Sequence, residues 1–492
     1  MTTQATTREK SGISDIVMMD ALPLGKALRA RQLSCVEVMT AYLDHIDRFN
    51  PQVNAIVSMR ERKDLLAEAA TRDQQLARGE DMGPLHGMPQ AIKDLAATKG
   101  LRTTQGSPIF KDTIPEADSL FVERMRNAGA IIIGKTNTPE FGLGSQTYNK
   151  VFGPTRNAYD PARTAGGSSG GAAVCLALRM LPVADGGDHA GSLRNPAAFN
   201  NVLGFRTSYG RVPQNNDDVF LPGLSVTGPM ARNVPDLQML LAVQAGYDDR
   251  VPLSIADPHS YATPSLDCDV KGKRIGWIGD FGGHLPMEPG VMELCRDALR
   301  TFESMGCIVE EVTPEFDPER IWSAWLVLRA FLQGTRLRAH YENPATRPLL
   351  KPEAQWEIER GMKLTAFDVM DASNVRTAWY HVVRKLFQRF DYLAMPSAQV
   401  FPFPIETHWP KTVAGKAMDT YHRWMEVVIP VTMSGCPAIG MPVGFNAAGL
   451  PMGMQIIGPN HAEHAVLQIA NAYEQATRWP DKVLPPLLRN GG

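Results

Sequence analysis

The sequence predicts an α/β protein, a single large α/β/α sandwich with a central mixed β-sheet flanked by helices. From about residue 85, short apolar strands, glycine loops and helices alternate along the chain, which is typical of layered α/β architectures. The alternation returns over residues 435–457 and ends in an expected helix at 462–476. Residues 172–178 are apolar on every side, which predicts a helix buried in the interior.

The elements follow in order from local signals. Ser34, with Glu37 three residues later, fits a capping box, and apolar residues then recur at helical spacing as far as Ile46. Residues 90–92 predict a short strand. Residues 119–128 predict a helix that Gly129 terminates, and residues 130–133 predict a fully apolar strand.

Residues 250–430 are less periodic than the rest. They contain a Trp-rich helical segment at 321–331 and proline-rich loops at 396–410. We expect a variable region here that selects the substrate, above all over 310–430, because loops on a rigid scaffold usually carry specificity. No internal repeat, low-complexity linker or domain boundary is evident, so the sequence predicts one domain over residues 1–492.

Composition excludes several classes of protein. The chain has 50 Lys and Arg against 52 Asp and Glu, a net charge of −2, which does not suit nucleic-acid or polybasic membrane binding. No stretch is long and apolar enough for a membrane helix, and residues 1–12 lack a secretory pattern. The six cysteines form no CxxC pair, which argues against zinc and iron–sulfur sites. We therefore expect a cytoplasmic protein, and a homo-oligomer remains open.

Two short motifs fail on inspection. Residues 129–136 match the phosphate-loop pattern GxxxxGK[ST], but the middle residues Ala-Ile-Ile-Ile favour a buried strand over a loop. Residues 166–170 match the GxSxG nucleophile elbow, yet residues 157–165 before them do not have the pattern of a strand. His461 and His464 lack an acidic partner pattern, so we expect surface side chains rather than metal ligands.

Two glycine-rich serine loops, at 165–171 and 185–196, carry the chemistry. Taken alone, each loop has an ordinary structural explanation, because glycines form tight turns and serines cap helices. Together, they can bring two serines within hydrogen-bonding distance beside exposed backbone N–H groups, which supplies a nucleophile, a relay hydroxyl and an oxyanion hole. Only His189 lies in a triad-like context among the histidines, and Lys93, at the end of an apolar strand, is the other candidate base.

Residues 85–213 closely resemble the amidase signature family, and the two serine loops with the lysine are highly specific for it. The resemblance continues to the C-terminal part of the chain. The matching segments are His-Gly-Met-Pro at 86–89, Ile-Lys-Asp at 92–94, Gly-Lys-Thr-Asn at 134–137, Phe-Gly-Pro-Thr-Arg-Asn at 152–157, Gly-Gly-Ser-Ser-Gly-Gly at 166–171, Gly-Ser-Leu-Arg-Asn-Pro-Ala at 191–197, Gly-Phe-Arg at 204–206, Gly-Arg-Val-Pro at 210–213, Gly-Leu-Pro at 449–451 and Gln-Ile-Ile-Gly at 455–458.

The resemblance implies a Ser–cis-Ser–Lys triad that needs no metal or organic cofactor. Ser192 would be the nucleophile, Ser168 the bridging serine after a cis peptide bond, and Lys93 the base. The oxyanion hole would come from the backbone N–H groups of residues 189–192: His189, Ala190, Gly191 and Ser192. A lysine acts as a base only when neutral, so its pKa must fall from about 10.4 towards about 7–8, the direction that burial gives.

One departure concerns His189 and Ala190, because the family usually has Gly-Gly before the nucleophile and often Thr before that pair. His189 either packs or faces solvent, or it contacts the substrate and modulates the pH dependence. The implied function is hydrolysis of a small apolar or aryl amide through an acyl-enzyme. The alternative is a carbamate (urethane) or ester hydrolase. The altered loop before Ser192 argues against the A-type component of a tRNA-dependent amidotransferase. A silent binding protein is also less favoured, since Lys93, Ser168 and Ser192 are all retained.

Overall fold

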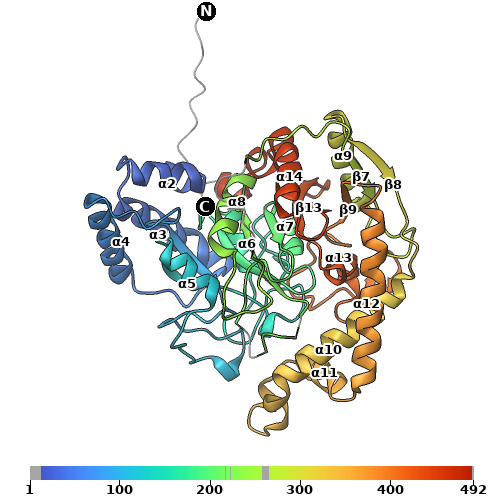
Figure 1. Ribbon diagram of the computed structural model, residues 1–492. Coiled ribbons are helices and arrows are strands. Elements are labelled where there is room, and N and C mark those ends of the chain that lie inside the picture. The colour runs from blue at the N-terminus through green and yellow to red at the C-terminus, as the bar shows by residue number, and fades with distance from the viewer. Residues whose placement is uncertain (1–12, 216–217, 222, 257–264, 490–492) are drawn as a thin grey trace, which may run out of the picture.

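A computed structural model describes residues 13–215, 218–221, 223–256 and 265–489 of the chain. Helices surround a large mixed β-sheet, which confirms the predicted α/β class (Figure 1). None of the helices in these residues is both long and apolar enough to cross a membrane. Residues 1–12, in which we looked for a secretory pattern, lie outside the described segments.

The central sheet has eight strands within the described residues, in the order β4-β6-β5-β12-β13-β9-β7-β8. Neighbours are antiparallel from β4 to β9, and β7 is parallel to both β9 and β8. Its strands are β4 (Ala184–Asp188), β5 (Leu203–Arg206), β6 (Val226–Ala231), β7 (Arg274–Trp277), β8 (Ile308–Glu311), β9 (Tyr392–Pro396), β12 (Ala438–Phe445) and β13 (Pro451–Ile457).

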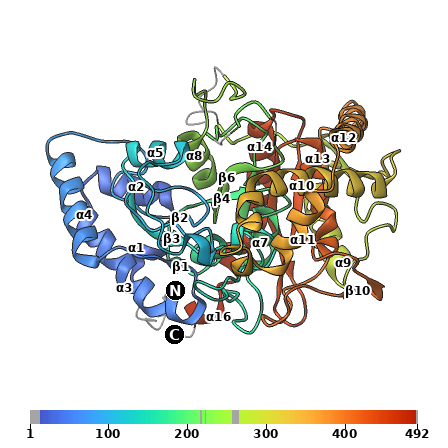
Figure 2. The same cartoon turned by 90° about the horizontal axis from the view of Figure 1, so that it is seen from below.

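A smaller sheet of order β1-β3-β2 lies beside it, formed by β1 (Ile56–Val57), β2 (Pro89–Lys93) and β3 (Ile131–Thr136). Figure 2 shows these strands among the N-terminal helices, next to β4 and β6. The edge strands β2 and β4 meet without a backbone ladder, because the N–H of Lys93 donates to the carboxylate of Asp185 instead. A short hairpin, β10 (Thr412–Val413) with β11 (Lys416–Ala417), completes the strands of the described residues.

Helices cover both faces of the central sheet. The described helices are α1 (Asp15–Met18), α2 (Ala21–Arg29), α3 (Cys35–Val53), α4 (Arg62–Ala77), α5 (Leu120–Asn127), α6 (Gly170–Ala177), α7 (Arg194–Asn200), α8 (Val234–Gln244), α9 (Val291–Ser304), α10 (Pro318–Glu342), α11 (Pro352–Gly361), α12 (Ala366–Leu386), α13 (Ile429–Ser434), α14 (Glu463–Thr477), α15 (Trp479–Lys482) and α16 (Pro486–Arg489), with short 3-10 turns at Pro108–Phe110, Glu140–Gly142, Arg347–Leu349 and Arg423–Val428.

Glycines in the strands bring α7 unusually close to the sheet. A Cβ added at Gly440 of β12 would lie 2.8 Å from the Cα of Arg194, and one at Gly453 of β13 would lie 2.8 Å from Ala198. The next residue of β12, Met441, faces the opposite side, where it lines a small cavity with Tyr473 of α14. The start of α7, which follows Ser192, is therefore held firmly against the centre of the sheet.

Most of the predicted N-terminal elements are confirmed. The capping box of Ser34 and Glu37 is present at the start of α3, and α5 ends two residues before Gly129, which has a φ of +93°. The phosphate-loop match at 129–136 forms β3, and Lys135 in it is buried and donates to the carbonyl oxygen of Ala96. Helix α6 is buried along its whole length.

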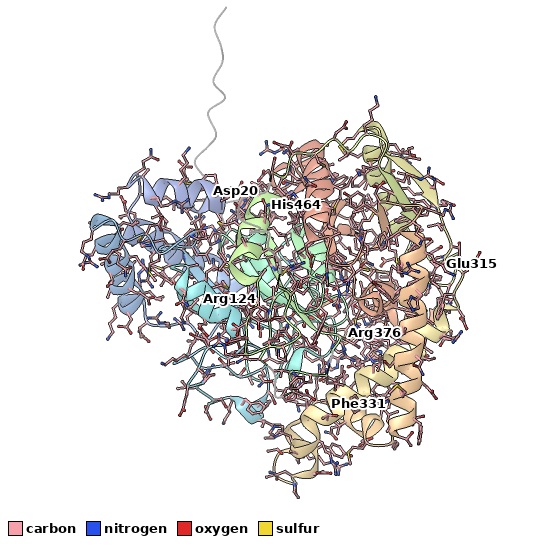
Figure 3. All side chains as sticks on the ribbon, in the orientation of Figure 1. Asp20, Arg124, Glu315, Phe331, Arg376 and His464 are labelled. Atoms are coloured by element: carbon pink, nitrogen blue, oxygen red, sulfur yellow. The ribbon has the colours of Figure 1, made fainter. Side chains whose placement is uncertain are left out.

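Residues 250–430 are more regular than the sequence analysis expected. They supply β7, β8 and β9 to the central sheet and the long helices α10 and α12. Helix α10 packs against α11, α12 and α13, so apolar side chains surround it instead of forming one stripe, which hides its length from a periodicity analysis. These helices, with Phe331 on α10 and Arg376 on α12, occupy one side of the molecule (Figures 1 and 3).

Candidate active site

Lys93 ends strand β2 and is only 3% exposed. Its Nζ lies 2.8 Å from Ser168 Oγ, 2.8 Å from Ser169 Oγ and 3.3 Å from the carbonyl oxygen of Gly187. Burial lowers the pKa of Lys93 to about 7, against the opposing charges of Asp185 and Asp188. The lysine therefore meets a serine loop as predicted, with an amine that is substantially neutral near pH 7.

The first serine loop precedes helix α6. The Gly167–Ser168 peptide bond is cis, as the resemblance implied, and Ser145 Oγ donates to the carbonyl oxygen of Gly167 at 2.7 Å. Ser169 is the residue before α6, and its Oγ is the second hydroxyl at Lys93, which the sequence analysis did not assign. The two serines thus share one amine.

Ser192 lies in the second loop, two residues before α7, and is 6% exposed. The two loops are joined by their backbones, because the N–H of Ser169 donates to the carbonyl oxygen of Ser192 at 3.2 Å. Among the described residues, the Ser192 hydroxyl makes no hydrogen bond. The structure therefore brings Ser192 beside the first loop, while no Oγ–Oγ hydrogen bond between Ser168 and Ser192 is formed.

The expected oxyanion hole needs one correction. The N–H of Gly191 donates to Asp188 Oδ1 at 2.9 Å, so this donor is already engaged. The N–H groups of His189, Ala190 and Ser192 have no acceptor within the described part of the chain. Three of the four predicted donors are thus available to a ligand.

Asp188 holds this turn together, although the sequence analysis gave it no role. Its carboxylate accepts from Arg194 Nε at 2.9 Å, Arg206 Nη1 at 3.0 Å and the N–H of Leu193 at 3.3 Å, and its side chain is fully buried. Burial alone would raise the pKa of Asp188, but the two guanidinium groups outweigh it and hold the pKa well below its usual range. The turn that leads to Ser192 is therefore clamped by a permanently ionised carboxylate.

His189 is anchored by its Nδ1, which lies 2.9 Å from Ser225 Oγ. Its Nε2 is buried and has no hydrogen-bond partner among the described residues. Burial, followed by the charge of Arg329, keeps the pKa of His189 well below its usual value. The ring is therefore neutral near pH 7, and Nε2 has an unused hydrogen-bonding position within the described residues.

Two apolar side chains, those of Leu95 and Val428, lie close to the serine loops. A Cβ added at Gly142 would lie 3.5 Å from Ser168 Oγ and 2.9 Å from the side chain of Leu95. A Cβ at Gly191 would lie 2.6 Å from the side chain of Val428. Hydrocarbon therefore lies beside both serine loops.

One group in the described residues has the composition of a metal site, formed by His284, Glu319 and Glu426. Arg423 pairs with both carboxylates, and His284 Nε2 lies 3.0 Å from Glu426 Oε1. Both carboxylates therefore already have a cationic partner in Arg423, and we interpret the group as an ion-pair network.

An α/β sandwich in which a buried lysine meets a glycine–serine loop is the arrangement that the resemblance implied for an amidohydrolase. The chain belongs to the amidase family, whose sequence profile matches residues 37–467. It is an enzyme that hydrolyses amide C–N bonds, as the resemblance implied.

Known relatives cover nearly the whole chain. It is 34% identical to an acylamidase of Rhodococcus erythropolis, over 94% of this chain and 96% of that protein. It is also 34% identical to a glutamyl-tRNA(Gln) amidotransferase subunit of Thermosynechococcus vestitus, over 93% and 97%. The crystal structure of a bacterial aryl acylamidase of the amidase signature family superposes with a TM-score of 0.90, at 29% identity, over 97% of this chain and all of that one.

Proposed function

We propose that the protein cleaves small apolar or aryl amides through an acyl-enzyme on Ser192, with Ser168 as the relay and Lys93 as the base. The observation that carries this proposal is the 2.8 Å contact between Lys93 Nζ and Ser168 Oγ, made by a buried amine whose pKa is about 7. At that distance a neutral amine accepts the Ser168 proton directly.

The proton path follows from this contact. Neutral Lys93 takes the proton of Ser168 as Ser168 takes that of Ser192, and the Ser192 oxygen attacks the carbonyl carbon. The backbone N–H groups of His189, Ala190 and Ser192 hold the oxyanion. The lysine then returns its proton through Ser168 to the leaving amine, and water releases the acyl group by the same path. Substrate binding must bring the Ser192 hydroxyl to Ser168, a contact that commonly tightens only in the complex.

The substrate class is argued from the surroundings of the serines. Leu95 and Val428 bound the space beside them, and Tyr421 lies 3.7 Å from a Cβ added at Gly144. A solved relative with a TM-score of 0.90 is named an aryl acylamidase, and the R. erythropolis relative an acylamidase. Both observations favour an apolar acyl or aryl amide over a charged substrate.

A panel of aryl amides, aliphatic amides, aryl carbamates and esters tests the proposal. We expect Ser192→Ala and Lys93→Met to abolish turnover of every substrate, and Ser168→Ala to lower kcat by at least about 100-fold. Ser208→Ala, which changes a buried serine hydrogen-bonded to the N–H of His461, is the matched control and should retain activity.

Acylation is tested by quenching a slow ester at low pH and locating the added acyl mass in the peptide that contains Ser192. Persisting hydrolysis in Ser192→Ala would reject the nucleophile and direct attention to Ser169. Preference for carbamates would assign the enzyme as a urethanase with the same triad. Copurification with a second protein chain, together with glutamine-dependent amidation of tRNA-bound substrate, would instead assign a component of an amidotransferase.

A further inference from the structure

Asp185 faces the catalytic lysine across the junction of the two sheets. The N–H of Lys93 donates to both oxygens of the Asp185 carboxylate, each at 3.2 Å, and Asp185 is 1% exposed. Within the described residues this carboxylate forms no ion pair. Asp188, at the other end of β4, is paired with Arg194 and Arg206. One buried carboxylate near Lys93 is therefore neutralised by arginines, and the other is not.

We propose that Asp185 is the positioning residue of the lysine base: its carboxylate anchors the end of β2 through the Lys93 N–H, and its charge controls how readily the Lys93 amine loses its proton. This inference rests on the proposed function, in which Lys93 must be neutral to act.

The anchoring follows from the strand edges. Strands β2 and β4 are both edge strands, and no ladder of backbone hydrogen bonds joins them. The hydrogen bond from the Lys93 N–H to the Asp185 carboxylate takes the place of a ladder hydrogen bond. Because the donor nitrogen is attached to the Cα of Lys93, this hydrogen bond fixes the point from which the lysine side chain starts. Lys93 Nζ also reaches the carbonyl oxygen of Gly187, two residues after Asp185 on β4. Both the backbone and the amine of Lys93 are thus hydrogen-bonded to β4, the strand that leads to the loop with Ser192.

The charge effect follows from the groups around the pair. Lys135 of β3 faces Asp185 and donates to the carbonyl oxygen of Ala96 and to Thr98 Oγ1. Asp94, the residue after β2, accepts from the N–H of Thr104, and its carboxylate is attracted by the charge of Lys135.

The remaining neighbours add little variable charge. The thiol of Cys175 on α6 stays protonated because burial raises its pKa. The charge of Asp188 is already balanced by Arg194 and by Arg206 of β5. Asp185 is therefore the carboxylate whose charge acts on Lys93 without an arginine to offset it.

The pKa values of Asp185 and Lys93 agree with a direct charge interaction between the two side chains. Burial raises the pKa of Asp185 to about 6, while burial lowers the pKa of Lys93 to about 7 against the attraction of Asp185. An ionised Asp185 favours the ammonium form of Lys93, so removing its charge must lower the pKa of the lysine. The pair titrates as a coupled unit, and the acid limb of the rate profile belongs to both groups.

Asp185→Asn tests the proposal, since asparagine keeps an acceptor for the Lys93 N–H and removes the charge. We expect the acid limb of kcat/KM to move to lower pH by about 1 unit or more, so that activity at pH 6 rises several-fold relative to pH 8. Asp94→Asn is the matched control, because it removes the buried carboxylate of the residue that directly follows β2, and this carboxylate makes no hydrogen bond with Lys93. Its limb should stay in place. An unmoved limb in Asp185→Asn, or equal shifts in both variants, overturns the proposal.

A readout without turnover separates this inference from the proposed function. NMR of the Lys93 ¹³Cε, assigned by its loss in Lys93→Met, should show the same shift in Asp185→Asn. Because coupling is reciprocal, Lys93→Met should raise the pKa of the Asp185 carboxyl by a similar amount, which keeps the test open if the asparagine variant fails to fold. If Lys93→Met remains active while the titrations shift, the proposed function fails and the coupling stands. If neither titration shifts, the coupling fails.

Discussion

Replacing Asp188 by alanine should be among the most destabilising single changes at the site. The carboxylate accepts five hydrogen bonds, two from Arg194, one from Arg206 and one each from the N–H groups of Gly191 and Leu193. Its removal leaves two buried guanidinium groups without their counter-charge and frees the turn that carries Ser192.

The magnitude follows from the partners that remain. Breaking a buried ion pair by removing one partner costs about 3–5 kcal/mol, because a buried charge is left uncompensated. Arg194 keeps bonds to Gln455 and Thr432, and Arg206 keeps bonds to two carbonyl oxygens, so both cations stay partly solvated by the protein. We therefore expect Asp188→Ala to lower the free energy of unfolding by about 3–5 kcal/mol. Because Arg194 and Arg206 both keep other hydrogen bonds, we expect no additional loss for the second guanidinium group.

Urea titration followed by tryptophan fluorescence measures this loss, with Asp44→Ala as the control. Asp44 pairs with Arg62, but its side chain is 63% exposed, so its removal should change the unfolding free energy by less than about 0.5 kcal/mol. The folded-state pKa of Asp188 lies below its unfolded value of about 3.9. Its stabilising contribution is thus fully present at neutral pH and is lost progressively as the pH falls from about 4 toward the much lower folded-state pKa, so the difference between wild type and Asp188→Ala should narrow over that range. A loss under about 1 kcal/mol at pH 7 would refute the clamp.

Three further predictions concern catalysis. Since the pKa of Lys93 is about 7, wild-type kcat/KM should rise about fivefold from pH 6 to 7 and less than about twofold from pH 7 to 8; a limb centred above pH 9 would contradict a buried neutral amine. Gly191→Ala should lower kcat/KM more than about tenfold, because Gly191 has a φ of +85° and the new Cβ would lie 2.6 Å from the side chain of Val428. The control is Gly449→Ala, which should leave activity intact because Gly449 also has a positive φ, +75°, but has open space around it. His189→Gln should change KM and leave the acid limb in place, because the ring is already neutral, and a limb that moves would assign His189 a role in the pH dependence.

Helices and strands whose ends are set by neighbouring residues could be predicted from local sequence signals. The capping box of Ser34 and Glu37 and the apolar strand before Lys135 needed only neighbouring residues to be recognised. The meeting of Lys93 with Ser168 was predicted from a family resemblance, since their separation along the chain says nothing about distance in space. No spacing rule links these two residues.

The residues that were missed act through tertiary contacts. Asp185 and Asp188 lay inside a loop already singled out, but only the fold shows that one carboxylate meets a backbone N–H and the other two arginines. The length of α10 was hidden because its partners bury it on several sides. A usable signal did exist for α12, because Thr365 and Asp368 form a capping box at its start.

Because β2 and β4 belong to different sheets, the catalytic rate should depend strongly on how the two sheets pack against each other. Lys93 ends a strand of the smaller sheet, Ser192 lies in the loop after β4 of the larger sheet, and the Asp185 carboxylate bridges the two sheets where backbone pairing is absent. A substitution that slides one sheet against the other by a fraction of an ångström leaves both sheets folded but parts the amine from its serine. Variants of this interior should consequently lose rate well before they lose resistance to heat.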